Sequence, residues 1–249
     1  MVISDSVRTL ERELRDVFGG RLQSLVIYGQ RVVRHAGGKH DAHAAHGHGH
    51  DAPPTHTLAI VDAMTPDDLR ACAVRVEAWH DAGLATPLLI ADHEFEQSLD
   101  AFPLEFGAIL ADHTVVAGTN PFASLAVDPA DVRRACEVQA RSHLLHLREG
   151  FLETRGRADA LAVLIVRSAA AFAALVTSIA RLEGHATDDA ASAARHVERT
   201  LGTPNSAVAE ITKLADAHDI SSADAVRLFG PYLDAVNRLV AYVDGWSAT

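Results

Sequence analysis

The chain has 249 residues, of which 48% are hydrophobic, 22% charged and 5% aromatic, and its formal net charge is −11. The negative charge argues against general nucleic-acid affinity, because a duplex backbone repels such a chain and the basic residues are scattered. The two cysteines, Cys72 and Cys136, are too few and too far apart for a disulfide framework or a thiolate metal site. The first residues contain no apolar signal segment, so we expect a cytoplasmic protein.

Helices and strands alternate in the first half of the chain. Short apolar runs bounded by turn residues predict strands, and apolar residues at helical spacing predict helices. Thr65 followed by Pro66 and two aspartates is typical of a helix start. The predicted elements are a helix over 6–18, strands in LQSLVIYG, HTLAIVDA, TPLLIAD and FGAILADHTVVAG, a helix from Thr65 to Gly83, and a short helix over 93–99.

The second half is predicted to be entirely helical from Asp128 onward, which indicates a helical bundle. One stretch, LAVLIVRSAAAFAALVTSIA, is apolar on all sides, so we expect it to be buried rather than to span a membrane. Such a helix needs a bundle or a second subunit around it, and a homo-oligomer or a protein partner is therefore expected. The predicted helices begin at Asp128, Asp159, Asp188, Ser206 and Ser222.

The order of a strand, the turn YGQR, a loop and a short apolar strand resembles the nucleotidyltransferase superfamily with the polymerase-β-like fold. The segments FPLEF and VAGTNPF also look like a bacterial subgroup of these proteins. The resemblance implies an α+β protein. Its first domain, 1–127, would be a nucleotidyltransferase-like mixed sheet with flanking helices, and its second, 128–249, an α-helical bundle.

Active members of this family hold two Mg²⁺ ions with paired carboxylates on one strand and a third on a later strand. Here the Gly-Ser turn reads Gly29-Gln30, the residues that would contact a nucleotide, and Thr55 and Thr57 replace the paired aspartates. The third acidic position is expected in EFGAIL, at Gly107 or Ala108. The loss of every acid predicts a catalytically degenerate protein with no catalytic residue.

The loop over 35–56 is rich in histidine and lies between the glycine turn and the degenerate strand. Imidazole suits Zn²⁺, Ni²⁺, Cu²⁺ and Co²⁺, so the tract predicts a transition-metal site. A low-complexity insertion, an engineered tag and a pH-sensing cluster remain alternatives. The candidate metal ligands are His40, His43, His46, His48, His50 and His56.

Three functions follow from these patterns. The leading interpretation is a degenerate nucleotidyltransferase-fold protein with a metal-binding loop, acting in binding, scaffolding or regulation. The first alternative is an active nucleotidyltransferase that uses Mg²⁺ and transfers a nucleoside monophosphate from NTP to a small molecule or protein through Glu105, Asp62 or Asp112. The second is a metal-storage protein or metallochaperone. His143 and His146, three residues apart on a predicted helix, form a weaker metal-site candidate.

Overall fold

The computed structural model describes residues 3–29, 54–185, 187, 189–202 and 207–246. The chain divides into two compact units, Met1–Val127 and Asp128–Thr249. The boundary falls at the residue where the strand-forming sequence ends and the helical sequence begins. Each unit has a core of its own and is described separately below.

The first unit is built around a four-stranded mixed sheet with the strand order β3-β2-β1-β4. Strand β1 pairs antiparallel with both β2 and β4, and β2 pairs parallel with β3. The mixed sheet and its flanking helices agree with the predicted α+β class. In chain order the elements are α1 (Asp5–Phe18), η1 (Gly19–Arg21), β1 (Leu22–Tyr28), β2 (His56–Val61), α3 (Pro66–Ala73), α4 (Val76–Asp81), β3 (Leu88–Ala91), α5 (Asp92–Ala101), α6 (Pro103–Ala111) and β4 (His113–Gly118).

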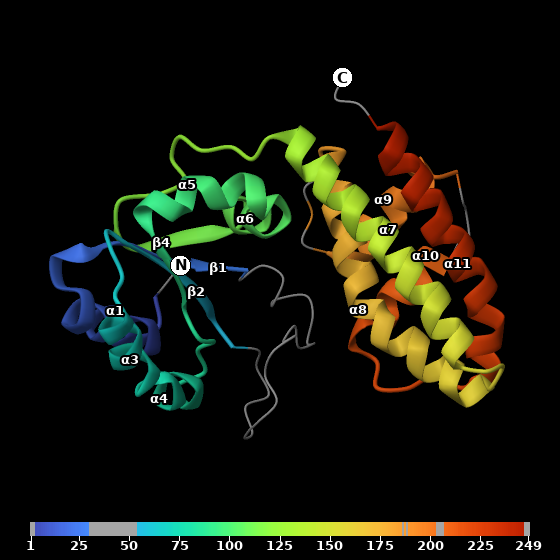
Figure 1. Cartoon of the computed structure of the whole chain (residues 1–249), viewed down its shortest axis with the longest axis horizontal. Helices are drawn as coiled ribbons and strands as arrows, with labels where there is room; N and C mark the ends of the chain where they lie inside the picture. The colour runs from blue at the N-terminus through green and yellow to red at the C-terminus, as the bar shows by residue number, and fades with distance from the viewer. Residues whose placement is uncertain (1–2, 30–53, 186, 188, 203–206, 247–249) are drawn as a thin grey trace. The chain divides into compact units, whose positions relative to one another are not determined.

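Both faces of this sheet are covered (Figure 1). Successive side chains of a strand point to opposite faces, so an apolar strand buried on both sides serves two cores. Leu25 of β1 packs with α1 and Trp79 of α4, whereas its neighbour Val26 packs with Phe95 of α5 and Phe106 of α6. This double burial explains why β1 and β2 are almost continuously apolar in sequence.

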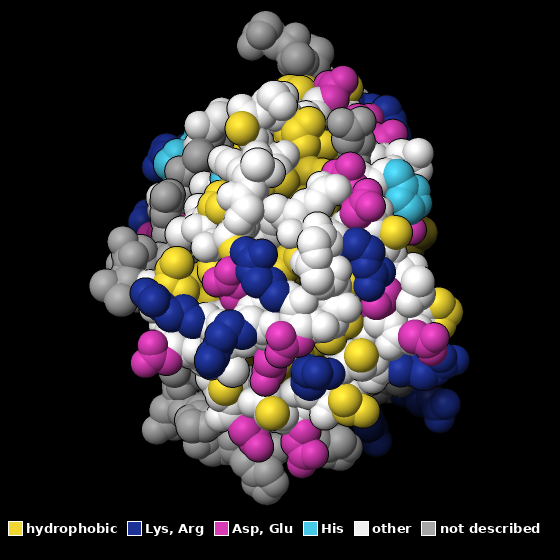
Figure 2. Space-filling model, turned by 90° about the vertical axis from the view of Figure 1, so that its left-hand side faces the viewer, with side chains coloured by type: hydrophobic (Ala, Val, Ile, Leu, Met, Phe, Trp, Pro, Cys, Tyr) yellow, Lys and Arg dark blue, Asp and Glu magenta, His cyan; other side chains and the backbone are white. Residues whose placement is uncertain are grey.

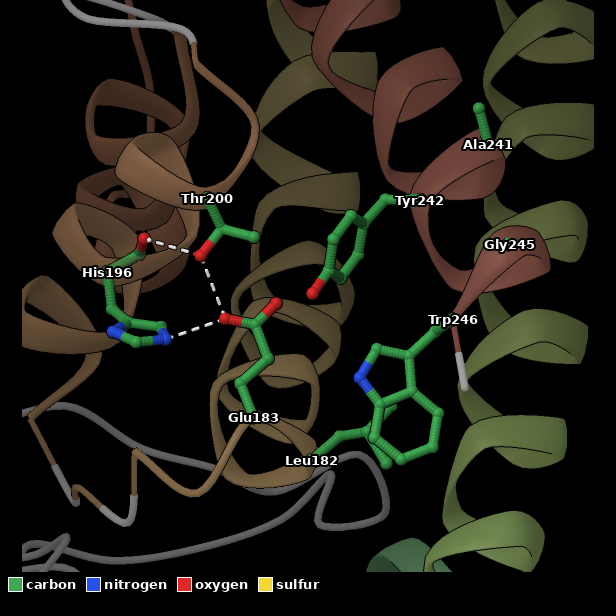
Figure 3. A pocket seen from close by; sticks show the side chains of 8 residues that line it. All are labelled: Leu182, Glu183, His196, Thr200, Ala241, Tyr242, Gly245 and Trp246. Carbon is green, nitrogen blue, oxygen red and sulfur yellow. Dashed lines mark hydrogen bonds and ion pairs between the residues drawn. The ribbon is translucent and has the colours of Figure 1, made fainter. Parts of the chain in front are cut away.

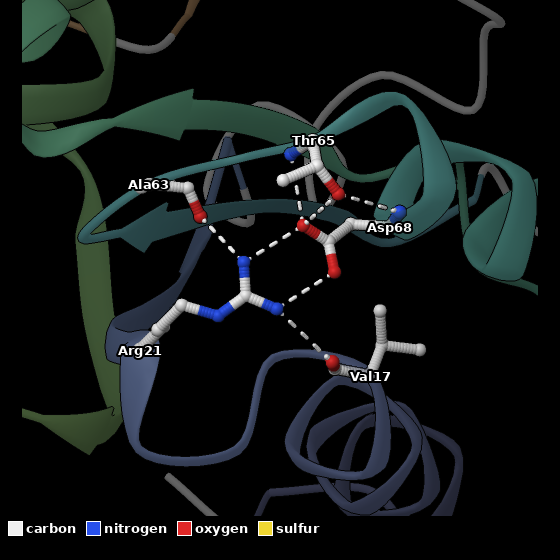
Figure 4. Close-up of polar contacts among 5 residues, drawn as sticks. All are labelled: Val17, Arg21, Ala63, Thr65 and Asp68. Carbon is white, nitrogen blue, oxygen red and sulfur yellow. Dashed lines mark hydrogen bonds and ion pairs between the residues drawn. The ribbon is translucent and has the colours of Figure 1, made fainter.

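Helix α3 begins with the capping residues expected from the sequence. The Thr65 hydroxyl accepts a hydrogen bond from the Asp68 amide, and the Asp68 carboxylate accepts one from the Thr65 amide. The same carboxylate binds the guanidinium of Arg21, which also donates to the carbonyl oxygens of Val17 and Ala63 (Figure 4). Arg21 thereby joins the segment before β1 to the start of α3.

Two predictions about the first unit are wrong. The helix expected from Thr65 to Gly83 is interrupted after Ala73, where the Arg75 amide donates to the Cys72 carbonyl three residues back and the helical turn tightens. The segment FGAIL, expected to contribute to a strand, belongs to helix α6, which Pro103 opens at its first turn. The strand in this region starts only at His113.

The second unit is a helical bundle, as predicted (Figure 1). Helix α8 is its centre and packs against α7, α9, α10 and α11. Among the described residues, α8 is also the one helix that is long and apolar enough to cross a membrane, with a mean hydropathy of 2.1. The helices are α7 (Pro129–Glu153), α8 (Ala158–Leu182), α9 (Ala190–Thr200), α10 (Ala207–Lys213), η2 (Leu214–Asp216) and α11 (Ser222–Gly245).

Basic and acidic side chains are interspersed on the face drawn in Figure 2. Blue and magenta groups lie next to each other there, and no broad area carries basic side chains alone. Separately, ion pairs occur along α1 and α3, such as Arg15 with Glu11 and Arg70 with Asp67. The scattered arrangement of basic residues in the sequence is therefore kept on this surface.

Candidate functional site

The first candidate site lies where β1 ends and β2 begins. Tyr28 pairs with His56 across the two strands, and their ring centroids are 5.7 Å apart. The next residue, Gly29, has φ +68°, a conformation that favours glycine, and its amide donates to the carbonyl oxygen of Asp112 at 3.2 Å. Burial raises the pKa of the Tyr28 hydroxyl. Gly29 thus lies directly after β1 and is tied by this hydrogen bond to the residue before β4.

The two threonines that replace the expected aspartates are on or beside β2. Thr57 pairs with Ile27 and is 1% exposed, and within the described part of the chain its hydroxyl has no hydrogen-bond partner. It shares a sheet face with Ala59, which is part of the apolar core beneath α1. Thr55 lies just before the strand, where it forms an isolated parallel bridge with Leu84. Neither position carries a charge.

The expected third acidic position is not in EFGAIL. Gly107 and Ala108 lie in helix α6, so their alignment with a strand carboxylate is wrong. The strand that runs parallel beside β2 is β3, Leu88–Ala91, and its four residues are Leu, Leu, Ile and Ala. The reason for the error is local: Pro103 begins a helix in a segment whose apolar residues alone suit either a strand or a helix.

The three acids of the alternative mechanism differ in position. Asp62 follows β2 at its far end, where its amide donates to the Arg21 carbonyl before β1 begins. Glu105 is exposed on α6, and Asp112 is 9% exposed beside the glycine turn. Asp62 and Asp112 are therefore at opposite ends of the sheet strands. Asp112 lies next to Gly29, whose amide donates to its carbonyl oxygen.

The described residues do not fit the pair of Mg²⁺ ions that the fold family implies. Mg²⁺ is bound in proteins through carboxylates and phosphate oxygens and sheds its water reluctantly. The positions on β2 supply a buried, neutral hydroxyl at Thr57, and β3 supplies only apolar side chains. Across residues 3–29 and 54–246, apart from the few that are not described, no three His, Cys, Asp or Glu side chains lie close enough to hold a metal ion.

The predicted histidine site falls mostly beyond what the structure describes. His40, His43, His46, His48 and His50 lie outside the described residues, as does Gln30 of the expected nucleotide turn. His56, the sixth candidate ligand, is the first residue of β2 and contacts Tyr28.

The weaker histidine pair on α7 is not arranged as a metal site. The ring nitrogen Nε2 of His143 is 2.7 Å from the Tyr232 hydroxyl, inside the bundle. His146 instead faces Glu149 on the exposed side of the same helix. Burial, with a smaller contribution from His146, lowers the pKa of His143 to about 4. His143 therefore acts as a neutral hydrogen-bonding residue of the core.

A second candidate site, which the sequence did not indicate, is a pocket of about 730 Å³ within the helical unit. It lies where the ends of α8 and α11 meet α9 (Figure 3). Its walls combine a carboxylate, an imidazole, two aromatic side chains and apolar groups. The lining residues are Leu182, Glu183, His196, Thr200, Ala241, Tyr242, Gly245 and Trp246.

The two oxygens of the Glu183 carboxylate have unequal surroundings. Oε2 lies 2.6 Å from His196 Nε2 and accepts a hydrogen bond from the Thr200 hydroxyl at 2.9 Å. Oε1 is buried on the other side of the carboxylate. The Tyr242 side chain points toward this oxygen (Figure 3), and burial, a hydrogen bond to the Glu183 side chain and the charge of that carboxylate raise the pKa of Tyr242 to about 12. The pocket therefore has an acidic wall.

These residues were missed because they are far apart in the chain and form no motif. His196 belongs to no histidine motif in the sequence, yet its ring stacks on His185 with centroids 4.4 Å apart and hydrogen-bonds Glu183. Glu183 follows directly after α8, and Tyr242 lies almost sixty residues later. Only the packing of α8, α9 and α11 brings them together.

Comparisons with known proteins agree with the fold. No family model matches this chain, and no curated protein sequence matches it. A solved structure, the spectinomycin adenyltransferase AAD(9) from Enterococcus faecialis with ATP and spectinomycin, is similar with a TM-score of 0.54 and 11% sequence identity. The match covers 94% of this chain and 98% of that chain. The chain therefore has a nucleotidyltransferase-like fold followed by a helical C-terminal region, as the sequence predicted.

Proposed function

We propose that the protein is a binding protein on the nucleotidyltransferase fold that does not transfer nucleotides, and that its histidine-rich segment binds a transition metal. The single observation that carries the first part is the chemistry of β2. The strand expected to hold paired carboxylates presents the hydroxyl of Thr57, which is 1% exposed and uncharged.

The energetic argument concerns the cost of dehydrating a small divalent cation. Nucleotidyl transfer by this fold relies on metal ions that neutralise charge on both the attacking and the leaving oxygen. A neutral hydroxyl offsets the lost hydration of Mg²⁺ far less than a carboxylate does. With threonines at 55 and 57 and an apolar β3, the described end of the sheet has no set of acids for this role.

The transition-metal part of the proposal rests on the composition of the segment between Gly29 and β2. Its imidazoles are suited to Zn²⁺, Ni²⁺, Cu²⁺ and Co²⁺ rather than to Mg²⁺. His56 begins β2, so at least one candidate ligand is attached to the rigid sheet. Metal binding there would serve a role in binding, scaffolding or regulation.

Transfer is tested with α-³²P-labelled ATP, GTP, CTP and UTP, Mg²⁺, and a panel of small hydroxylated amines and the protein itself as acceptors. We expect no labelled product above that of a protein-free reaction. A Thr55→Ala/Thr57→Ala variant is the matched control, because it alters the degenerate positions without adding or removing an acid. Mg²⁺-dependent product from the unaltered chain would overturn the proposal.

An active nucleotidyltransferase remains the second candidate, and one observation favours it. Asp112 is held beside the glycine turn by the hydrogen bond from Gly29 to its carbonyl oxygen. If transfer occurs through this acid, Asp112→Asn abolishes labelling, whereas Asp62→Asn, at the far end of β2, leaves it unchanged. Equal labelling by all three proteins would assign the activity to a contaminant.

Metal binding is tested by isothermal titration of Ni²⁺ and Zn²⁺ into protein made without an affinity tag. Removal of residues 39–50 is expected to lower the affinity at least about tenfold, which corresponds to roughly 1.4 kcal/mol. The control replaces three exposed histidines outside the segment with alanine: His93, His146 and His218. Unchanged affinity after the deletion would exclude the segment, and several metals per chain would favour the storage function instead.

A further inference from the structure

Most polar groups that line the pocket of the helical unit are bonded to one another. The Glu183 carboxylate is bound on one oxygen by His196 at 2.6 Å and by the Thr200 hydroxyl at 2.9 Å. The Tyr242 hydroxyl forms a further hydrogen bond with the Glu183 side chain. With these three partners the carboxylate is satisfied inside the fold, so an incoming donor would have to displace one of them. The carboxylate is therefore a wall of the pocket and does not require a ligand.

Trp246 differs from these residues. Its half-buried indole ring projects into the pocket, and in Figure 3 the ring nitrogen is on the edge nearest Glu183 and Tyr242. An indole N–H can only donate a hydrogen bond, and no described residue accepts one from it. Among the polar side chains of the lining, only that of Trp246 has no partner in the described part of the chain.

We propose that this pocket binds a small, neutral aromatic molecule that carries a carbonyl group as a hydrogen-bond acceptor, and that the Trp246 indole N–H donates to this carbonyl. The site is formed by residues of the second unit alone. It is therefore independent of the glycine turn of the first unit and of whether the protein transfers nucleotides.

The remaining walls suit the aromatic part of such a ligand. Tyr242 and Trp246 offer rings against which another ring can pack in an offset or edge-to-face arrangement. Leu182 and Ala241 add apolar surface. Gly245 has no side chain, and a Cβ at this position would meet nothing within 4 Å, so the pocket stays open beside it. The volume of about 730 Å³ is in the range of small-molecule sites.

Charged ligands fit this pocket less well than a neutral one. An anion would face the Glu183 carboxylate, which repels it. An organic cation is attracted by aromatic faces, but an amine that binds the carboxylate has to replace a hydrogen bond already made within the fold. The described side chains form no group of three His, Cys, Asp or Glu residues that could hold a metal ion. A neutral carbonyl leaves the bonds of Glu183 intact and gives the Trp246 N–H an acceptor.

The test follows the indole N–H directly. The chain has two tryptophans, so a ¹⁵N-labelled sample shows two indole N–H cross-peaks in an NMR spectrum, and Trp79→Phe assigns them. Benzamide is the probe, with benzoate and benzylammonium as anionic and cationic analogues at matched ionic strength. We expect benzamide to shift the Trp246 cross-peak downfield and saturably, and each charged analogue to bind at least about fivefold more weakly. No saturable shift below about 10 mM benzamide, or tighter binding of benzylammonium, would overturn the proposal.

Two matched tryptophan variants separate the hydrogen-bond donor from the aromatic ring. Trp246→Phe keeps an aromatic wall but has no N–H, so benzamide should bind at least about threefold more weakly by calorimetry. Trp79→Phe is the same change in the first unit, where the indole N–H already donates to Glu13 at 2.6 Å, and it should leave benzamide binding unchanged. Parental affinity in Trp246→Phe would remove the indole N–H from the site.

A tyrosine variant tests why the pocket prefers a neutral ligand. Tyr242→Phe keeps the ring but removes the hydroxyl that bonds Glu183, which leaves the carboxylate with one donor fewer. Benzylammonium should therefore bind more tightly to this variant than to the parent, whereas benzamide binding should change by less than about twofold. An unchanged affinity for benzylammonium would contradict the role assigned to the hydrogen bonds of Glu183.

Discussion

Arg21 and Asp68 form a two-pronged ion pair that joins the start of β1 to the start of α3. Arg21 Nη1 donates to Asp68 Oδ2 and Nη2 to Oδ1, both at 2.7 Å. The Thr65 amide and hydroxyl donate to the same Oδ2 at 2.8 Å (Figure 4). These hydrogen bonds, first that of Arg21 and then those of Thr65, hold the pKa of Asp68 well below its usual range.

The first prediction concerns the pH dependence of this pair. Because the pKa of Asp68 is lower in the folded chain than in the unfolded one, its stabilising effect is complete above the unfolded value of about 3.9 and is lost as the pH falls toward the folded value. Asp68→Asn should lower the unfolding midpoint at pH 7. The difference from the parent, measured by urea unfolding from pH 7 to pH 2, should shrink only below about pH 4.

Arg21→Lys is the matched control for this prediction. It keeps the positive charge but cannot form the two parallel hydrogen bonds, so it should destabilise the first unit less than Arg21→Ala does. Equal unfolding midpoints for the lysine and alanine variants would mean that the planar geometry of the guanidinium contributes nothing here.

The second prediction concerns the Thr57 hydroxyl, which has no hydrogen-bond partner among the described residues. Replacement of a buried, unsatisfied polar group by an apolar one of the same shape removes a desolvation cost, so Thr57→Val should raise the free energy of unfolding by about 1 kcal/mol. Thr154→Val is the control, because the Thr154 hydroxyl donates to the Phe151 carbonyl at 2.7 Å, and its loss should be destabilising by about 1 kcal/mol. Thermal unfolding of both variants and of the parent chain measures the two changes in stability.

A loss of stability in Thr57→Val would mean that the hydroxyl stabilises the fold and would contradict this prediction. A gain of stability with a loss of nucleotide affinity would mean that the hydroxyl belongs to a binding site.

The third prediction uses two glycines that both have positive φ but differ in surroundings. A Cβ at Gly118 would lie 1.8 Å from the Gln23 carbonyl oxygen, whereas a Cβ at Gly29 would meet nothing within 4 Å. Gly118→Ala should therefore disrupt the pairing of β4 with β1 and lower the free energy of unfolding by about 3 kcal/mol or more. Gly29→Ala incurs backbone strain alone, about 1–2 kcal/mol. Urea unfolding monitored by circular dichroism measures both, and equal losses would contradict the close approach of β4.

Much of the fold could be predicted because its signals are local. The capping of α3 by Thr65, the apolar runs of β1 and β2 and the change of pattern at Asp128 each depend on neighbouring residues. The helical conformation of FGAIL was not predicted, because a short apolar run has no decisive period. Pro103, which precedes this run, begins the helix that contains it.

The site residues were harder to predict because they meet only after the fold has formed. The sequence indicated Thr55 and Thr57, on or just before β2, since alternation along one strand fixes which residues share a face. The sequence alone does not predict that Arg21 contacts Asp68, 47 residues away, or that His196 of α9 contacts Glu183 after α8. Such contacts depend on helix packing angles that single-sequence periodicity does not encode.

The last prediction concerns His143, which is half-buried in the bundle against Tyr232 and Phe172. Burial lowers the pKa of His143 to about 4 in the folded chain, below the usual 6.5. The unfolded chain therefore binds a proton first, and the bundle loses stability as the pH falls from about 6.5 to 4, by up to roughly 3 kcal/mol. His143→Gln keeps a hydrogen bond to Tyr232 but does not titrate, so it should flatten this slope in unfolding measured at each pH. An unchanged slope, or a histidine NMR titration with a midpoint near 6.5 for His143, would contradict the buried neutral ring.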